Sequence, residues 1–196
     1  DSKFIFLSRN PLAVAASISK AWTKNKIQFS QYHYLFNEGV ESFSENYTKN
    51  KDRVLLIKYE NLVKNPNDQI KKINQYLNLQ NKINTNNLNT SNLRGTMGDS
   101  FLPSTFDKDM INDNKNWINF YDSIYRKIWA KRFLKKIGQK NLEIMGYNES
   151  ELFKQIKSKK TLKIISFKDI IGYLQYRLYE IVRKIRFREF GFREVF

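Results

Sequence analysis

Cysteine is absent from this chain of 196 residues, and histidine occurs once. The lack of cysteine excludes a disulfide framework and a thiolate metal site, and a single histidine argues against a histidine-based metal site. No apolar run approaches the ~18 residues of a membrane span, and no signal peptide is visible. We expect no metal and a cytoplasmic location. Because the chain begins with Asp1 rather than methionine, we also expect an N-terminal part to precede it.

Positive charge is the main compositional bias. The chain has 35 Lys and Arg against 19 Asp and Glu, a formal net charge of +16. This balance favours anionic partners such as nucleotide phosphates, sulfated or phosphorylated substrates, nucleic acid or an anionic membrane. Hydrophobic residues make up 41% of the chain, which is enough for the core of one domain.

Two continuous apolar runs, at residues 3–8 and 53–59, have the pattern of strands buried on both faces. Asn10 suits an N-cap and Pro11 a first helical position, so we expect a helix over residues 12–22. Apolar spacings of three and four predict further helices over residues 29–49, after Asn65-Pro66, over 117–137 and up to Met145, where Gly146 is a plausible stop. Residues 80–116 are polar and aperiodic, which predicts a long loop.

The order of these elements predicts the fold class. Two strands joined by helices imply a parallel sheet with a right-handed crossover. Parallel sheets are covered on both faces and rarely stop at two strands. We therefore predict the C-terminal part of a doubly wound α/β domain over residues 1–148, its sheet incomplete, followed by C-terminal helices.

Residues 149–196 are predicted to form a basic, amphipathic helical tail. From residue 154 onward the chain holds twelve Lys and Arg against four Asp and Glu, with apolar residues spaced by four and three from Phe167 to Ile185. Such a helix can pack on its own domain or on a partner helix. It can also lie in the surface of an anionic membrane. Contact with either partner would run through residues 167–190, and the membrane contact would make the cytoplasmic protein peripheral to the bilayer.

Arg9 stands directly after the first predicted strand. Ligands of open parallel sheets sit beyond the carboxyl ends of the strands, and a guanidinium beside a helix N-terminus forms an anion site. Ser17 lies about 9 Å further up the helix, at ~1.5 Å per residue. Both residues can reach one phosphate only if it lies along the helix flank. The alternatives are an ordinary surface ion pair for Arg9 and no role for Ser17.

The stretch FIFLSRNPLAVAASISKAW resembles the 3′-phosphate-binding motif of sulfotransferases that depend on 3′-phosphoadenosine 5′-phosphosulfate (PAPS). That motif is a hydrophobic strand, then Arg, Asp or Asn, Pro, and a Ser eight residues beyond the Arg. Arg9, Asn10, Pro11 and Ser17 fit this spacing. The resemblance implies that Arg9 and Ser17 hold the 3′-phosphate of PAPS.

Two later segments resemble the same family in the expected order. In VLLIKYENLVKNP, Tyr59 matches a tyrosine that lies against the nucleotide, although Asn61 replaces the usual Asp. In LRGTMGD, Arg94 and Gly95 match the loop that covers the nucleotide, although Leu93 replaces the usual Arg. The resemblance implies that Arg94 binds the 3′-phosphate and that the Gly95 backbone approaches it closely, since no Cβ intervenes. The closing IGQKNLEIMGY resembles the family's C-terminal helix and Gly-Tyr.

What the resemblance implies is a P-loop-type fold and transfer of a sulfuryl group from PAPS to an acceptor hydroxyl or amine, such as one of a glycan, without a metal. The family's 5′-phosphosulfate loop and catalytic base are expected upstream of residue 1. No catalytic residue is therefore assigned in this chain, which as a fragment would be inactive alone. His33 is expected to pack or to lie at the surface.

Two other functions stay open from the residues alone. A P-loop phosphotransferase, such as a nucleoside kinase, would share half of a doubly wound sheet. A non-enzymatic basic module would bind nucleic acid or a membrane. Nucleic acid is the less favoured partner, because the aromatic residues follow core periodicity rather than forming stacking platforms. The partners expected are the nucleotide donor and an unidentified acceptor.

Overall fold

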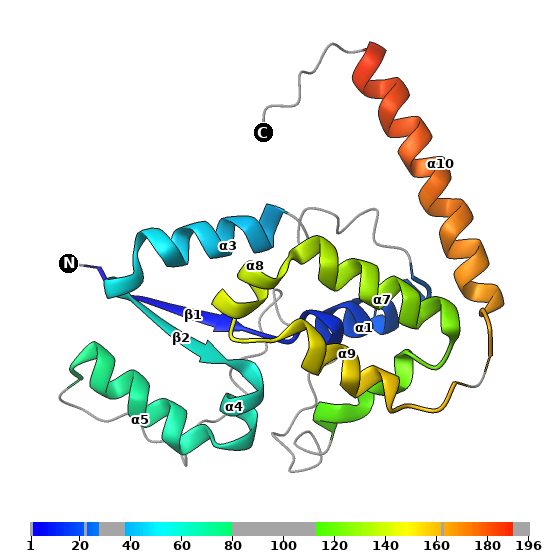
Figure 1. Cartoon of the computed structure of the whole chain (residues 1–196). Helices are drawn as coiled ribbons and strands as arrows, with labels where there is room; N and C mark the ends of the chain where they lie inside the picture. Colours follow the sequence, from blue (N-terminus) through cyan, green and yellow to red (C-terminus); the bar gives the residue numbers. More distant parts are fainter. Residues whose placement is uncertain (1, 22, 28–37, 80–112, 162, 190–196) are drawn as a thin grey trace.

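The computed structural model describes residues 2–21, 23–27, 38–79, 113–161 and 163–189, which are drawn in colour in Figure 1. The loop with Arg94 and Gly95, which is predicted to cover the nucleotide, lies outside these ranges. So do His33 and the first part of the helix predicted over residues 29–49.

The sheet is parallel, as predicted. Strand β1 (Phe4–Ser8) pairs with β2 (Val54–Lys58) in a register that sets Ser8 beside Lys58, and the short 3₁₀ turn η2 (Lys51–Arg53) leads into β2. The prediction that the second strand runs to residue 59 is wrong, because Tyr59 begins helix α4 (Tyr59–Lys64). The backbone N–H of Asn10 donates to Glu60, and this bond, 3.0 Å long, holds the chain in a turn immediately after β2.

The class of the fold is α/β, with helices in the majority and two strands among the described residues. The prediction that the first strand is buried on both faces is wrong for the chain as described, because Phe4, Ile5 and Leu7 of β1 are between 41% and 55% exposed. Further strands of a doubly wound, P-loop-type sheet stay a prediction.

Helices lie on both sides of the two strands (Figure 1). On one side, α3 (Glu38–Lys49) packs through Phe43 against Phe6, with ring centroids 5.0 Å apart. On the other side, α5 (Pro66–Leu77) begins with its proline in the first turn, as predicted. Asn65 occupies the N-cap position of α5, although its side chain makes no capping hydrogen bond.

Helix α1 (Pro11–Ala21) begins as the sequence predicts, because the Asn10 side-chain oxygen accepts a hydrogen bond from the Leu12 N–H at 2.9 Å. The apolar face of α1 packs against the C-terminal helices of the domain. Tyr121 is fully buried there and donates its hydroxyl to the Leu12 carbonyl at 2.8 Å.

The helix predicted over residues 117–137 is in fact two elements, the 3₁₀ helix η5 (Asp113–Phe120) and α7 (Ile124–Ile137). The break lies at Ser123, whose backbone is extended and whose side chain caps α7 by accepting from the Arg126 N–H. The loop predicted to continue to residue 116 thus ends earlier.

Two short helices complete the domain core. Helix α8 (Gln139–Ile144) is followed by Gly146 with φ of +84°, which confirms the predicted stop. Helix α9 (Glu149–Lys157) follows. The buried core joins α1 to α7, α8 and α9 through residues that include Leu12, Ala15, Leu134, Leu142, Leu152 and Ile156.

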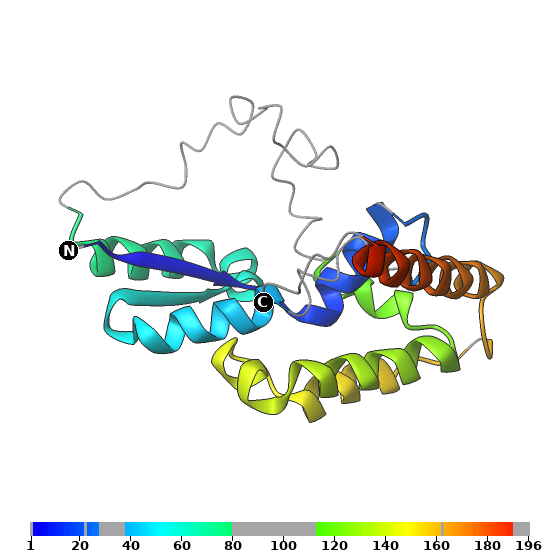
Figure 2. The ribbon, with the colours of Figure 1, turned by 90° about the horizontal axis from the view of Figure 1, so that it is seen from above.

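The predicted tail of residues 149–196 begins with α9, which packs in the core, and continues as helix α10 (Phe167–Glu189), which projects from the body of the molecule (Figures 1 and 2). The first turn of α10 is fixed to the domain, because Asp169 is fully buried and pairs with Arg126 of α7. The division at residue 148 stays a prediction. Within the described ranges, no helix is both long and apolar enough to cross a bilayer.

Candidate functional site

The carboxyl ends of the two strands bring Arg9 and Tyr59 together. Each residue directly follows a member of the Ser8–Lys58 pair. The guanidinium carbon of Arg9 lies 4.5 Å from the centroid of the Tyr59 ring, so a cation–π contact orients it. The Nε of Arg9 is buried and has no hydrogen-bond partner within the part of the chain that the structure describes. This group is held in place while part of its hydrogen-bonding capacity is free for a ligand.

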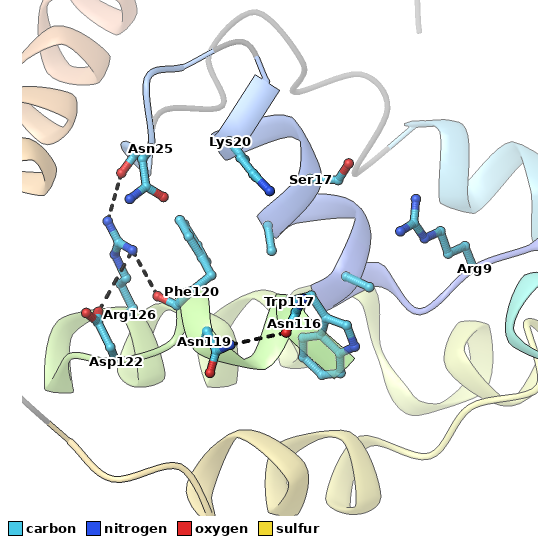
Figure 3. A pocket seen from close by; sticks show the side chains of 12 residues that line it. Arg9, Ser17, Lys20, Asn25, Asn116, Trp117, Asn119, Phe120, Asp122 and Arg126 are labelled. Atoms are coloured by element: carbon cyan, nitrogen blue, oxygen red, sulfur yellow. Dashed lines mark hydrogen bonds and ion pairs between the residues drawn. The ribbon is translucent and has the colours of Figure 1, made fainter. Parts of the chain in front are cut away.

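Ser17 and Lys20 come from the same face of α1, since residues three apart on a helix are neighbours. Both side chains are exposed. Figure 3 shows the Arg9 guanidinium directed toward α1, on the side from which Ser17 projects. Sequence reasoning missed Lys20, and its spacing of three from Ser17 was the signal that could have identified it.

Arg9, Ser17 and Lys20 line one side of a pocket of about 490 Å³ (Figure 3). This volume is within the range of small-molecule sites. Across from α1, η5 supplies the opposite wall through Asn116, Trp117, Asn119 and Phe120, and Asn25, Asp122 and Arg126 close one end. None of these wall residues was predicted, because apolar spacing indicates that residues 117–137 are helical but not which element they face.

Charge in the pocket is uneven. Arg126 is neutralised by Asp169, and Asp122 pairs with Lys163 at 2.8 Å. In contrast, no carboxylate of the described ranges lies within ion-pair distance of Arg9 or Lys20. The α1 side of the pocket therefore offers two uncompensated cations and a hydroxyl, which suits an anionic ligand.

A carboxylate behind the site holds its framework. Glu60 accepts from the Asn10 N–H with one oxygen, and with the other from the Tyr147 hydroxyl at 2.6 Å. Burial, and then the hydrogen bond to Glu60, raise the pKa of Tyr147 well above its ordinary value. Glu60 thus fixes the turns that carry Arg9 and Tyr59. Glu60 and Tyr147 both lie within segments that resemble the family, but the sequence predicted no role for either.

Of the five residues predicted to bind the nucleotide, the structure brings Arg9 and Tyr59 together at one edge of the sheet and places Ser17 with Arg9 in the lining of one pocket. Tyr59 lies under the guanidinium rather than among the residues that line the pocket. Arg94 and Gly95 are outside the described ranges, so their binding role stays a prediction.

This arrangement defines an α/β protein with a pocket beyond the carboxyl edge of a parallel sheet, lined on one side by Arg9 and Lys20. A family model described as "Sulfotransferase domain" matches residues 1–145. The chain therefore belongs to the sulfotransferase family, which confirms the resemblance of its motifs and indicates general sulfotransfer activity. Comparison with curated proteins and comparison with solved structures gave no match.

Proposed function

We propose that this protein transfers a sulfuryl group from PAPS to an acceptor hydroxyl or amine, and that Arg9 and Ser17 bind the 3′-phosphate of the donor. The observation that carries the proposal is the Arg9 guanidinium, fixed on the Tyr59 ring with its buried Nε lacking a partner among described residues. A charged group held in this way gains most from an anion that accepts its hydrogen bonds.

The start of α1 supports a phosphate at the helix flank rather than at its tip. Pro11 has no N–H, and the Leu12 N–H is already donated to the Asn10 side chain. The Asn10 N–H is likewise donated to Glu60. The N–H groups of Asn10 and Leu12 are thus engaged, while the Arg9 guanidinium is directed toward the side of α1 from which Ser17 projects (Figure 3).

The chemistry proposed is an in-line displacement at sulfur. The acceptor oxygen or nitrogen forms the new bond to sulfur and gives up its proton to a general base, as the bond from sulfur to the 5′-phosphate oxygen breaks, which releases adenosine 3′,5′-bisphosphate. Such a reaction depends on positioning and on stabilising charge at the leaving phosphate. The described residues would position the donor by its 3′-phosphate, and Arg94 and the Gly95 backbone are proposed to bind the same phosphate. A glycan is one acceptor class that fits the proposal.

The test is the preference for a 3′-phosphate in the protein at its full natural length. Adenosine 3′,5′-bisphosphate should raise the thermal unfolding midpoint far more than 5′-AMP, since only the former offers the phosphate that Arg9 binds. Arg9→Ala removes a charge-assisted hydrogen bond, which contributes about 1.5–3 kcal/mol. It should weaken bisphosphate binding by about 10- to 100-fold.

Arg53→Ala is the matched control. Arg53 also lies over an aromatic ring, 5.5 Å from the centroid of Phe4, but precedes β2 at the opposite end of the strand pair. This variant should bind the bisphosphate like the wild type. Equal responses to both nucleotides would contradict the proposal and favour a phosphotransferase or a non-enzymatic basic module.

A further inference from the structure

Helix α10 exposes a continuous apolar stripe. Phe167, Ile170, Leu174, Leu178 and Ile181 are spaced by three or four residues, and each side chain is between 41% and 75% exposed. Spacings of this kind place side chains on one face of a helix. Val182 of the same helix and Ile164, just before it, are also exposed. An exposed apolar surface of this extent marks an interaction site.

The domain contacts the opposite face of α10. At about 100° per residue, Asp169 and Gly172 lie across the helix from Leu174 and Leu178. Asp169 accepts a hydrogen bond from the Ile27 N–H at 3.1 Å, and a Cβ added at Gly172 would lie 3.0 Å from the Ile27 carbonyl oxygen. The helix is therefore docked by its polar and small residues, and its apolar stripe faces away from the domain.

Positive charge accompanies the stripe. Lys168 and Arg177 are exposed and lie on its two sides, by the same helical geometry. The sequence of α10 adds Arg183, Lys184, Arg186 and Arg188 in its later turns, against Glu180 and Glu189. Asp169 does not offset this charge at the surface, because it is buried and paired with Arg126.

We propose that α10 binds the surface of an anionic phospholipid bilayer, with its apolar stripe inserted at the level of the headgroups. Cations beside an apolar stripe can reach lipid phosphates while the stripe enters the bilayer. The anchor at Asp169 and Gly172 would fix the angle at which the sulfotransferase domain meets the membrane. The inference does not depend on the nucleotide proposed above.

The charge of α10 favours an anionic bilayer over a second copy of the chain as its binding partner. A second copy of the chain would bring two basic helices together, with few acidic residues on either to compensate. An acidic bilayer matches both features of the surface, the apolar stripe and the cations beside it.

The experiment is co-sedimentation of the full-length protein with vesicles. One set contains phosphatidylcholine alone, and the other contains equal parts of phosphatidylcholine and phosphatidylglycerol. The wild type should bind the anionic vesicles much more tightly, and the affinity should fall with added salt. Leu174→Glu/Leu178→Glu, two changes at exposed positions, should weaken binding by at least about tenfold.

Gln75→Glu/Gln155→Glu is the matched control, since it adds the same two charges at exposed polar positions of α5 and α9. It should retain most of the affinity, and all variants should keep the wild-type thermal midpoint. Failure to bind anionic vesicles, or equal binding to both vesicle types, would overturn the proposal. A dimer in sedimentation velocity that the leucine changes dissociate, without vesicle binding, would assign the stripe to a second copy instead.

Discussion

Arg126 and Asp169 form a two-pronged ion pair inside the protein, with Nε to Oδ2 at 2.7 Å and Nη2 to Oδ1 at 3.0 Å. Their side chains are 3% and 0% exposed. The same guanidinium donates to the carbonyl oxygens of Phe120 and Asn25, at 2.9 and 2.8 Å. One residue therefore ties the tail helix to two segments that line the pocket.

Loss of one partner of this pair should destabilise the whole domain. Asp169→Ala would leave the Arg126 charge buried without its carboxylate and the Ile27 N–H without its acceptor. We expect the free energy of unfolding, measured by urea denaturation, to fall by about 3–5 kcal/mol. Glu45→Ala, which breaks the exposed Lys49–Glu45 pair, should change it by less than about 0.5 kcal/mol. Similar effects of the two changes would show that burial does not determine the strength of the Arg126 pair.

Close packing at Gly172 should make larger residues costly. Gly172→Val would place side-chain atoms against the Ile27 carbonyl and the Lys26 side chain, both already within 3.2 Å of an added Cβ. Overpacking of this kind costs about 1–3 kcal/mol, and limited proteolysis should cut the tail faster. Leu174→Val, on the exposed side of α10, should leave the proteolysis rate unchanged. Equal rates for Gly172→Val and the wild type would contradict the docking contact.

Alkaline pH should weaken the fold through Tyr147. Its pKa is raised in the folded state, mainly by burial and then by the bond to Glu60, so the unfolded chain loses the hydroxyl proton first. The stabilisation is complete below the unfolded pKa of about 10 and declines as the pH rises above it, by at most about 1.4 kcal/mol per pH unit. In Tyr147→Phe, the free energy of unfolding, measured by urea denaturation, should fall less between neutral and alkaline pH than in the wild type. If the free energy of unfolding fell with pH as steeply as in the wild type, this role for Tyr147 would be contradicted.

Lys20 should contribute to anion binding less than Arg9 does. Its side chain is exposed at the pocket wall, so solvent and salt screen its charge. Lys20→Ala should weaken binding of adenosine 3′,5′-bisphosphate by a few-fold at low salt and by less at high salt, as titration calorimetry would measure. Lys71→Ala, an exposed change on α5 away from the pocket, should have no effect. A loss as large as that of Arg9→Ala would assign Lys20 the main phosphate contact.

Local signals predicted much of the fold. The strand runs, the Asn10 cap and the Gly146 stop each depend on a few consecutive residues, and the structure contains all three. Arg9 and Tyr59 could be placed together because parallel strands bring their carboxyl ends to one edge.

Long-range pairs could not be predicted in the same way. Glu60 and Tyr147 are 87 residues apart, and Arg126 and Asp169 are 43 apart. No periodicity links such positions, so their contacts appear only once helix packing is known. The break at Ser123 was missed for a related reason, since apolar spacing continues across it while the serine backbone is extended.

The central claim is that Arg9 binds the 3′-phosphate. A thermodynamic cycle that combines one mutation with two ligands tests it most directly. Dissociation constants of the wild type and Arg9→Ala would be measured by calorimetry for adenosine 3′,5′-bisphosphate and for 5′-AMP. If the account holds, Arg9→Ala weakens bisphosphate binding by at least about tenfold more than 5′-AMP binding. An equal loss for both nucleotides, or no loss for either, would show that Arg9 does not contact the 3′-phosphate.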